Sequence, residues 1–120
     1  MEATMLIYGL EGQELKKLKT LSQKKSIRPK LIAPADYGQR VGAFCGVAKR
    51  LETLPEVSGV GPMLVFAHVA ERQLDAFITE LRTARVGLNA IKAILTPTNA
   101  GWDAGKLYAE LTKERNEMGG

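Results

Sequence analysis

One stretch decides the fold of this chain: Ile91-Lys92-Ala93-Ile94-Leu95, then Thr96-Pro97-Thr98-Asn99-Ala100-Gly101, then Trp102 and a helical pattern that contains Leu107 and Leu111. An apolar run, a break rich in Pro, Asn and Gly, and an apolar stripe of period 3.6 predict a strand, a tight loop and a helix in that order. The other elements of the chain can be placed by looking for the same strand, loop and helix order elsewhere in the sequence.

The same order occurs earlier in the chain. At a constant offset of 63 positions, five residues align with Pro97, Asn99, Gly101, Gly105 and Leu107, namely Pro34, Asp36, Gly38, Gly42 and Phe44. The apolar run 63–67 likewise matches the run 5–9. We therefore predict one domain, residues 1–120, built from a duplicated β-α-β-α unit with copies at 5–52 and 63–115 and a connector at 53–62.

The remaining elements follow from periodicity. Residues 5–10 and 63–67 are almost wholly apolar and predict strands buried on both faces, whereas Pro29 and Lys30 place the strand 28–33 at a sheet edge. Three amphipathic stripes predict helices before the last one, and they contain Leu15, Leu18 and Leu21, then Val41, Phe44, Ala48 and Leu51, then Leu74, Phe77, Ile78 and Leu81.

Strands that alternate with helices are typical of α/β domains. With the apolar strands central, the predicted order is 2-1-3-4, in a four-stranded and mainly parallel sheet. Right-handed crossovers then place the two helices that link paired strands on opposite faces, so that helices cover both faces. The alternative is a two-layer sheet in which strands one and three are antiparallel and all helices lie on one face.

Composition describes an ordinary globular chain. Of its 120 residues, 45% are apolar and 25% are charged, close to the globular average. Cys45 is the only cysteine, so no disulfide forms within the chain and a reducing compartment, the cytoplasm, is expected. The N-terminus has neither the basic start of a signal peptide nor an apolar run long enough for a membrane span.

The positive charge is concentrated in the first half. Residues 1–60 hold ten Lys or Arg against six Asp or Glu, and residues 61–120 hold seven of each. The basic face is a run without acidic residues that contains Lys16, Lys17, Lys19, Lys24, Lys25, Arg28 and Lys30. This face suits an acidic protein or nucleic acid, contacted through phosphates, or is a solvated surface without a partner.

A family resemblance lies in the second half. Residues 92–99 read Lys-Ala-Ile-Leu-Thr-Pro-Thr-Asn and are followed by Trp102, Leu107, Glu110 and Glu114. This pattern resembles a prokaryotic family known as a domain of unknown function and numbered thirty-seven eighty-three. The resemblance covers about residues 63 to 115 and is weaker in the first half, through Asp36 and Tyr37. It implies no activity, substrate or cofactor.

The loop after the last strand is the first candidate ligand site. Thr96, Thr98 and Asn99 bring hydroxyl and amide groups next to free backbone N–H groups, so an anion could bind there. The alternative is that Thr98 or Asn99 caps the helix while Trp102 packs its first turn on the sheet. His68, the only histidine, follows strand three and would line a crevice at the carboxyl ends of strands one and three, or is a plain surface residue.

Several chemistries lack support. The loop 9–12 has neither the dinucleotide fingerprint nor a phosphate-binding Lys-Ser/Thr ending, and one histidine with one cysteine does not supply a structural zinc site. We expect no cofactor, no metal and no catalytic residue, and interpret Cys45 as a small core residue. The leading hypothesis is a small cytoplasmic binding module, and the alternative is a small-molecule or anion-binding regulator or enzyme that uses His68 and the loop 96–99. The oligomeric state is open.

Overall fold

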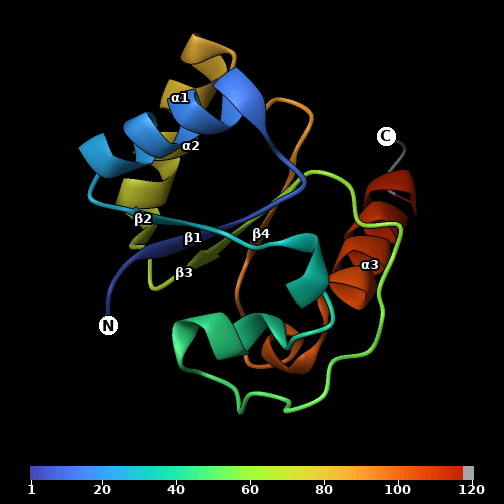
Figure 1. The fold of residues 1–120 in the computed structure, drawn as a ribbon. Helices are drawn as coiled ribbons and strands as arrows, with labels where there is room; N and C mark the ends of the chain where they lie inside the picture. Colours follow the sequence, from blue (N-terminus) through green and yellow to red (C-terminus); the bar gives the residue numbers. More distant parts are fainter. Residues whose placement is uncertain (118–120) are drawn as a thin grey trace.

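The computed structural model describes residues 1–117 and contains four strands, three α-helices and three short 3₁₀ segments (Figure 1). None of these helices is both long enough and apolar enough to span a bilayer. Seven of the eight expected elements are present, and the exception is the helix after residue 41. In chain order the elements are β1 (Thr4–Tyr8), α1 (Gly12–Lys24), β2 (Arg28–Leu31), η1 (Pro34–Asp36), η2 (Val41–Cys45), β3 (Met63–Ala67), α2 (Glu71–Ala84), β4 (Ile91–Ile94), η3 (Asn99–Gly101) and α3 (Ala104–Glu117).

The strands form one mixed sheet of order β2-β1-β3-β4, which confirms the predicted order. β1 pairs with β2 and β3 with β4 in parallel, but β1 and β3 are antiparallel, with Tyr8 opposite Met63. The prediction that strands one and three are parallel is therefore wrong. A parallel pair needs a crossover that returns the chain to the opposite end of the sheet, and no α-helix between β2 and β3 provides one.

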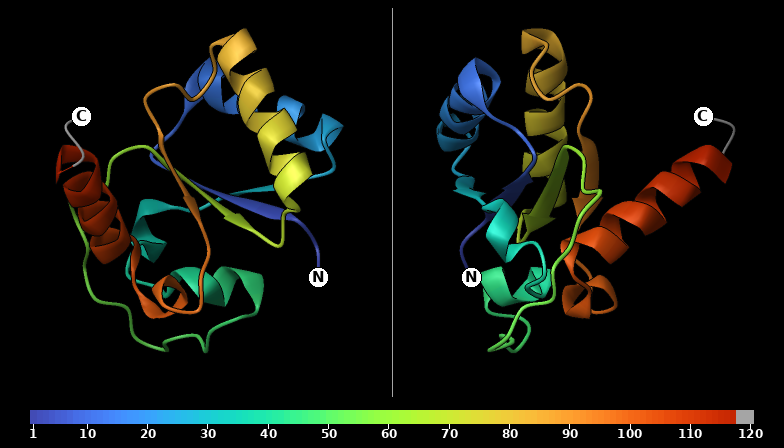
Figure 2. Two further views of the ribbon diagram at one scale, coloured as in Figure 1. Left: turned by 180° about the vertical axis from the view of Figure 1, so that it is seen from behind. Right: turned by 45° about the vertical axis from the view of Figure 1, so that its right-hand side comes forward.

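Helices cover both faces of the sheet, but α1 and α2, which are expected on opposite faces, lie on the same one (Figure 2). Because β1 and β3 run in opposite directions, crossovers of the same hand bring both helices to one face. α1 and α2 lie side by side on one face, where Leu18 and Phe77 pack with Met5 and Leu64. On the other face, α3 and the loop segments pack their apolar side chains onto Leu6, Tyr8, Met63 and Val65. Both central strands are fully buried because each is covered on its two faces.

The helix expected over residues 41–51 is replaced by the 3₁₀ segment η2, which is terminated by Gly46 directly after it, with a φ of +73°. Two glycines, Gly42 and Gly46, weaken an α-helix here, since each costs about 1 kcal/mol relative to alanine. Gly42 also allows η2 to pack directly on η3, because a Cβ atom there would lie 2.7 Å from the Cβ of Ala100. Close packing of the two 3₁₀ segments takes the place of the helix.

The segment 46–62 contains no helix or strand and is held by Gln39. This side chain is only 2% exposed. Its Oε1 accepts from the backbone N–H of Leu51 at 2.8 Å, and its Nε2 donates to the Leu51 carbonyl at 3.1 Å. A buried amide thus fixes the long connection between the two halves of the sheet.

Candidate functional site

A groove separates the edge strand β4 from α3. Its volume is about 430 Å³, and α3 runs obliquely away from the sheet (Figure 2). Apart from Leu111, every lining residue belongs to the sequence pattern on which the family resemblance rests. The lining consists of Lys92, Ala93, Ile94, Thr96, Thr98, Asn99, Trp102, Leu107, Glu110, Leu111 and Glu114.

Asn99 closes the loop at one end of the groove. Its Oδ1 accepts from the N–H of Thr96 at 2.9 Å, and its Nδ2 donates to the Ile94 carbonyl at 3.1 Å. The Thr96 hydroxyl in turn accepts from the N–H of Asn99 at 3.1 Å. These bonds occupy the amide of Asn99 in shaping the loop, whereas Thr98 is exposed at the groove.

Neither Thr98 nor Asn99 caps α3, because the helix begins at Ala104. Asp103 fills that position, and its Oδ1 accepts from the N–H of Lys106 at 2.9 Å. Sequence reasoning missed Asp103, although an Asp directly before a helical stripe is a usual cap signal. Trp102 is half-buried, packs against the apolar cluster beneath α3, and has the Lys106 ammonium 5.0 Å from its ring centre.

Lys92 of β4 is turned back against its own chain. Its Nζ donates to the carbonyls of Gly87 at 2.8 Å and Ala90 at 3.0 Å. Burial lowers the pKa of the Lys92 ammonium, and the nearby charges of Arg82 and Arg115 lower it further. Because the Lys92 ammonium is used locally, Glu110 and Glu114 are the remaining charged side chains of the groove.

The structure brings two of the predicted ligand residues together at a second cavity. β3 and β4 are parallel, so His68 and Thr96, which follow them, meet at the same end of the sheet. The cavity has a volume of about 290 Å³ and is also lined by Val47, Leu95, Pro97 and Ala100. The expected crevice between the carboxyl ends of strands one and three does not form, because β1 is antiparallel to β3 and ends at the opposite end of the sheet.

His68 is exposed and adopts a left-handed backbone conformation with a φ of +59°. Within residues 1–117 its ring has no hydrogen-bond partner. Thr98 and Asn99 line the groove beside β4 rather than this cavity. The four candidate residues therefore divide between two neighbouring sites, and Thr96 lines both of them.

The basic face is partly used inside the molecule. Lys25 forms an ion pair with Glu80 at 3.2 Å, Arg28 pairs with Glu2 at 3.0 Å, and the Lys30 ammonium lies 5.6 Å from the ring centre of Phe44. The other four members lie on α1 and take no part in the ion pairs of the described chain, namely Lys16, Lys17, Lys19 and Lys24.

Cys45 is half-buried, and burial raises the pKa of its thiol, an effect that the charge of Lys30 partly offsets. A raised pKa keeps the thiol protonated and unreactive, in keeping with a packing role. Burial also raises the pKa of Tyr8, whose hydroxyl has no partner among the described residues. Within residues 1–117, no cluster of His, Cys, Asp or Glu is arranged to hold a metal ion.

One comparison with known proteins covers the region of the β4–α3 groove. Residues 62–118 match the model of DUF3783, a domain of unknown function. The match extends from the start of β3 to α3 and so includes every residue of the groove and His68, but not α1 or β2. No curated protein and no solved structure matches the chain.

Proposed function

We propose that this protein is a binding module that holds an extended peptide segment along β4, in the groove between β4 and α3. The observation that carries the proposal is that, apart from Leu111, the groove is lined by residues of the pattern that resembles the family, and the match to the family model spans all of them. The peptide would add a strand to the sheet, a common mode of peptide recognition.

The backbone of β4 supports strand addition. The N–H of Ile91 donates to the Pro62 carbonyl at 3.0 Å, and the N–H of Leu95 donates to the Phe66 carbonyl at 2.9 Å. Because these directions alternate along a strand, the N–H groups of Lys92 and Ile94 point to the open edge. An extended peptide could accept hydrogen bonds from both.

The walls of the groove define the peptide's chemistry. Trp102 and Leu111 offer partly exposed apolar surface on one side, over the buried Leu107. Ile94 is 60% exposed at the strand itself. Glu110 and Glu114 lie one turn apart on α3 and are in no ion pair of the described chain. A strand with apolar and basic side chains complements this lining.

The test uses a heptapeptide of alternating valine and lysine, titrated into ¹⁵N-labelled protein. The amide signals of Lys92 and Ile94 should shift and gain protection from hydrogen exchange, because those N–H groups become bonded. Lys92→Pro removes one outward N–H without removing a bond to β3, so it should weaken binding at least about tenfold.

Lys92→Ala is the matched control, since it removes the same side chain but keeps the N–H. It should bind the peptide as the wild type does. Shifts confined to α1, or equal affinity of the proline and alanine variants, would contradict strand addition at β4.

The second candidate function is small-molecule or anion binding in the cavity that His68 and Thr96 share, favoured by their convergence at the ends of two parallel strands. Inorganic phosphate is a suitable probe. Binding should shift the ring signals of His68 and be lost in His68→Ala and Thr96→Val. Unchanged ring signals at saturating phosphate would contradict this candidate.

The internal duplication stays a prediction with structural support. Thr4 pairs with Arg28 and Met63 pairs with Ile91, so the strand pairing aligns Thr4 with Met63, one position away from the sequence match of Met5 with Met63. After β2 and β4, the N–H of Gln39 donates to the Asp36 carbonyl and that of Trp102 to the Asn99 carbonyl, both at 3.0 Å. The offset of 63 positions relates both pairs. A single domain and a cytoplasmic location likewise remain predictions.

A further inference from the structure

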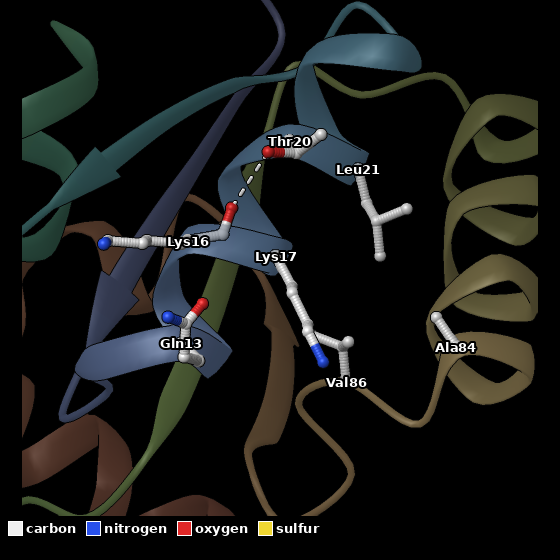
Figure 3. A pocket seen from close by; sticks show the side chains of 7 residues that line it. All are labelled: Gln13, Lys16, Lys17, Thr20, Leu21, Ala84 and Val86. Atoms are coloured by element: carbon white, nitrogen blue, oxygen red, sulfur yellow. Dashed lines mark hydrogen bonds between the residues drawn. The ribbon is translucent and has the colours of Figure 1, made fainter.

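A second surface lies outside the matched family region, in the groove between α1 and α2 (Figure 3). The groove has a volume of about 500 Å³. The lining residues of α1 follow the i, i+3, i+4, i+7 spacing of one helix face, and the remainder come from the end of α2. They are Gln13, Lys16, Lys17, Thr20 and Leu21 from α1, with Ala84 and Val86 from the other side.

The floor of this groove is apolar and its rim is positive. Leu21 and Val86 belong to the cluster beneath the two helices, and the small side chain of Ala84 leaves room between them. In Figure 3 the Lys17 side chain extends toward Val86, whereas Lys16 points to the outer side of α1. The Thr20 hydroxyl donates to the Lys16 carbonyl at 3.1 Å, so the lysines dominate the polar surface.

Lys16 and Lys17 take part in no ion pair within the described chain. Glu14, the acidic residue in the first turn of α1, uses its Oε2 to accept from the N–H of Gly87 at 3.0 Å. Glu80 of α2 is paired with Lys25, away from the groove lining. Arg85, directly between two lining residues, is exposed and adds a further positive charge.

We infer that this groove binds an acidic amphipathic helix from a partner protein. Its apolar residues would pack on Leu21 and Ala84, above the buried Val86. Its carboxylates would meet Lys17 in the groove and Lys16 on the outer rim of α1. The lining of α1 spans about two helical turns, or roughly 12 Å, which suits a helix packed against α1. Nucleic acid fits less well, because no aromatic side chain lines the groove for base stacking.

The probe is a fluorescein-labelled helical peptide of leucine, glutamate and alanine, with leucine and glutamate on adjacent stripes of one helix face. A second peptide has glutamine in place of every glutamate. In anisotropy titrations at low salt, the acidic peptide should bind at least about tenfold more tightly than the neutral one, and the difference should shrink as salt rises.

The protein variant is Lys16→Glu combined with Lys17→Glu, which should weaken binding of the acidic peptide at least about tenfold. The matched control, Arg72→Glu with Lys113→Glu, changes the net charge equally at exposed positions outside the groove and should bind as the wild type. Thermal melts by circular dichroism verify that both variants are folded.

Three outcomes would overturn the inference: no binding of the acidic peptide at low salt, equal binding of the two peptides, or undiminished binding by the double lysine variant. A labelled single-stranded oligonucleotide is titrated in parallel. If the oligonucleotide binds more tightly than the peptide, and the double lysine variant no longer binds it, the groove is a nucleic-acid surface. The assignment to an acidic helix is then wrong.

Discussion

β2 and β4 occupy corresponding edges of the sheet but differ in what they offer a partner. Pro29 lies opposite Met5, the second residue of β1, and Lys92 lies opposite Leu64, the second residue of β3. Proline has no N–H to donate, so β2 is protected at this position, and its charged neighbours discourage pairing further. β4 keeps its donor. The comparison indicates that one edge is closed to other chains and the other is left available.

The segments that follow the two edge strands differ as well. After β2 the chain forms η1 and η2 and then the irregular segment 46–62, whereas after β4 it forms η3 and the helix α3. Only the second ending supplies a helical wall beside an open strand. A shared scaffold can therefore carry a binding groove in one half and a purely structural connection in the other.

The largest effect is expected for Gln39, which stands 63 positions before Trp102. Gln39→Ala should lower the free energy of unfolding by about 3 kcal/mol, because it empties a buried site and leaves the N–H and C=O of Leu51 without partners. Urea denaturation measures the loss. Gln13→Ala, at an exposed position, should cost less than about 0.5 kcal/mol, and similar losses for the two variants would refute the anchoring role.

Trp102 should matter less than Gln39 although its side chain is larger. Its ring is half-buried, so Trp102→Ala should cost about 2 kcal/mol, below the range for a fully buried Trp. Trp102→Phe should recover most of that loss. If urea melts show a loss under about 1 kcal/mol, the ring does not stabilise the fold and is available for binding instead.

The acidic wall of α3 should contribute a smaller and purely binding effect. Glu110→Lys with Glu114→Lys should lower affinity for the alternating valine and lysine peptide about tenfold, or about 1.4 kcal/mol. Glu52→Lys with Glu56→Lys makes the same charge change at exposed positions of the segment 46–62 and serves as the control. Equal losses for both pairs, measured by calorimetry, would mean that net charge rather than the groove attracts the peptide.

The smallest effect concerns the backbone after the central strands. His68 and Gly9 each directly follow a central strand with positive φ, +59° and +71°. His68→Gly should raise the free energy of unfolding by about 0.5 kcal/mol, because relief of strain slightly exceeds the entropy cost of glycine. Gly9→Ala should do the opposite, since its Cβ would lie 3.1 Å from the carbonyl carbon of Gly61. A loss of stability in His68→Gly would show that its side chain makes a useful contact.

Much of the scaffold could be predicted from local pattern. The apolar runs of β1 and β3 predict central strands, Pro29 predicts an edge, and the stripes of α1 and α2 predict their buried faces. For the candidate site, the loop that contains Thr96 and Asn99 was correctly placed between β4 and the last helix. These features can be predicted locally because each depends on residues that are neighbours in the chain: an apolar run, a proline without an N–H group, or an apolar stripe of helical period.

The sequence by itself determined which strands are central, their order and the presence of the helices α1 and α2, but not that both of these helices lie on one face. Only the tertiary structure decided the direction of β3, because a strand buried on both faces has the same apolar pattern whether it pairs in parallel or antiparallel. It also decided that residues 41–51 do not form a helix, since the contact of Gly42 with Ala100 joins segments far apart in the chain. The β4–α3 groove depends on the angle of α3, and that angle is set by packing on the sheet rather than by any local pattern.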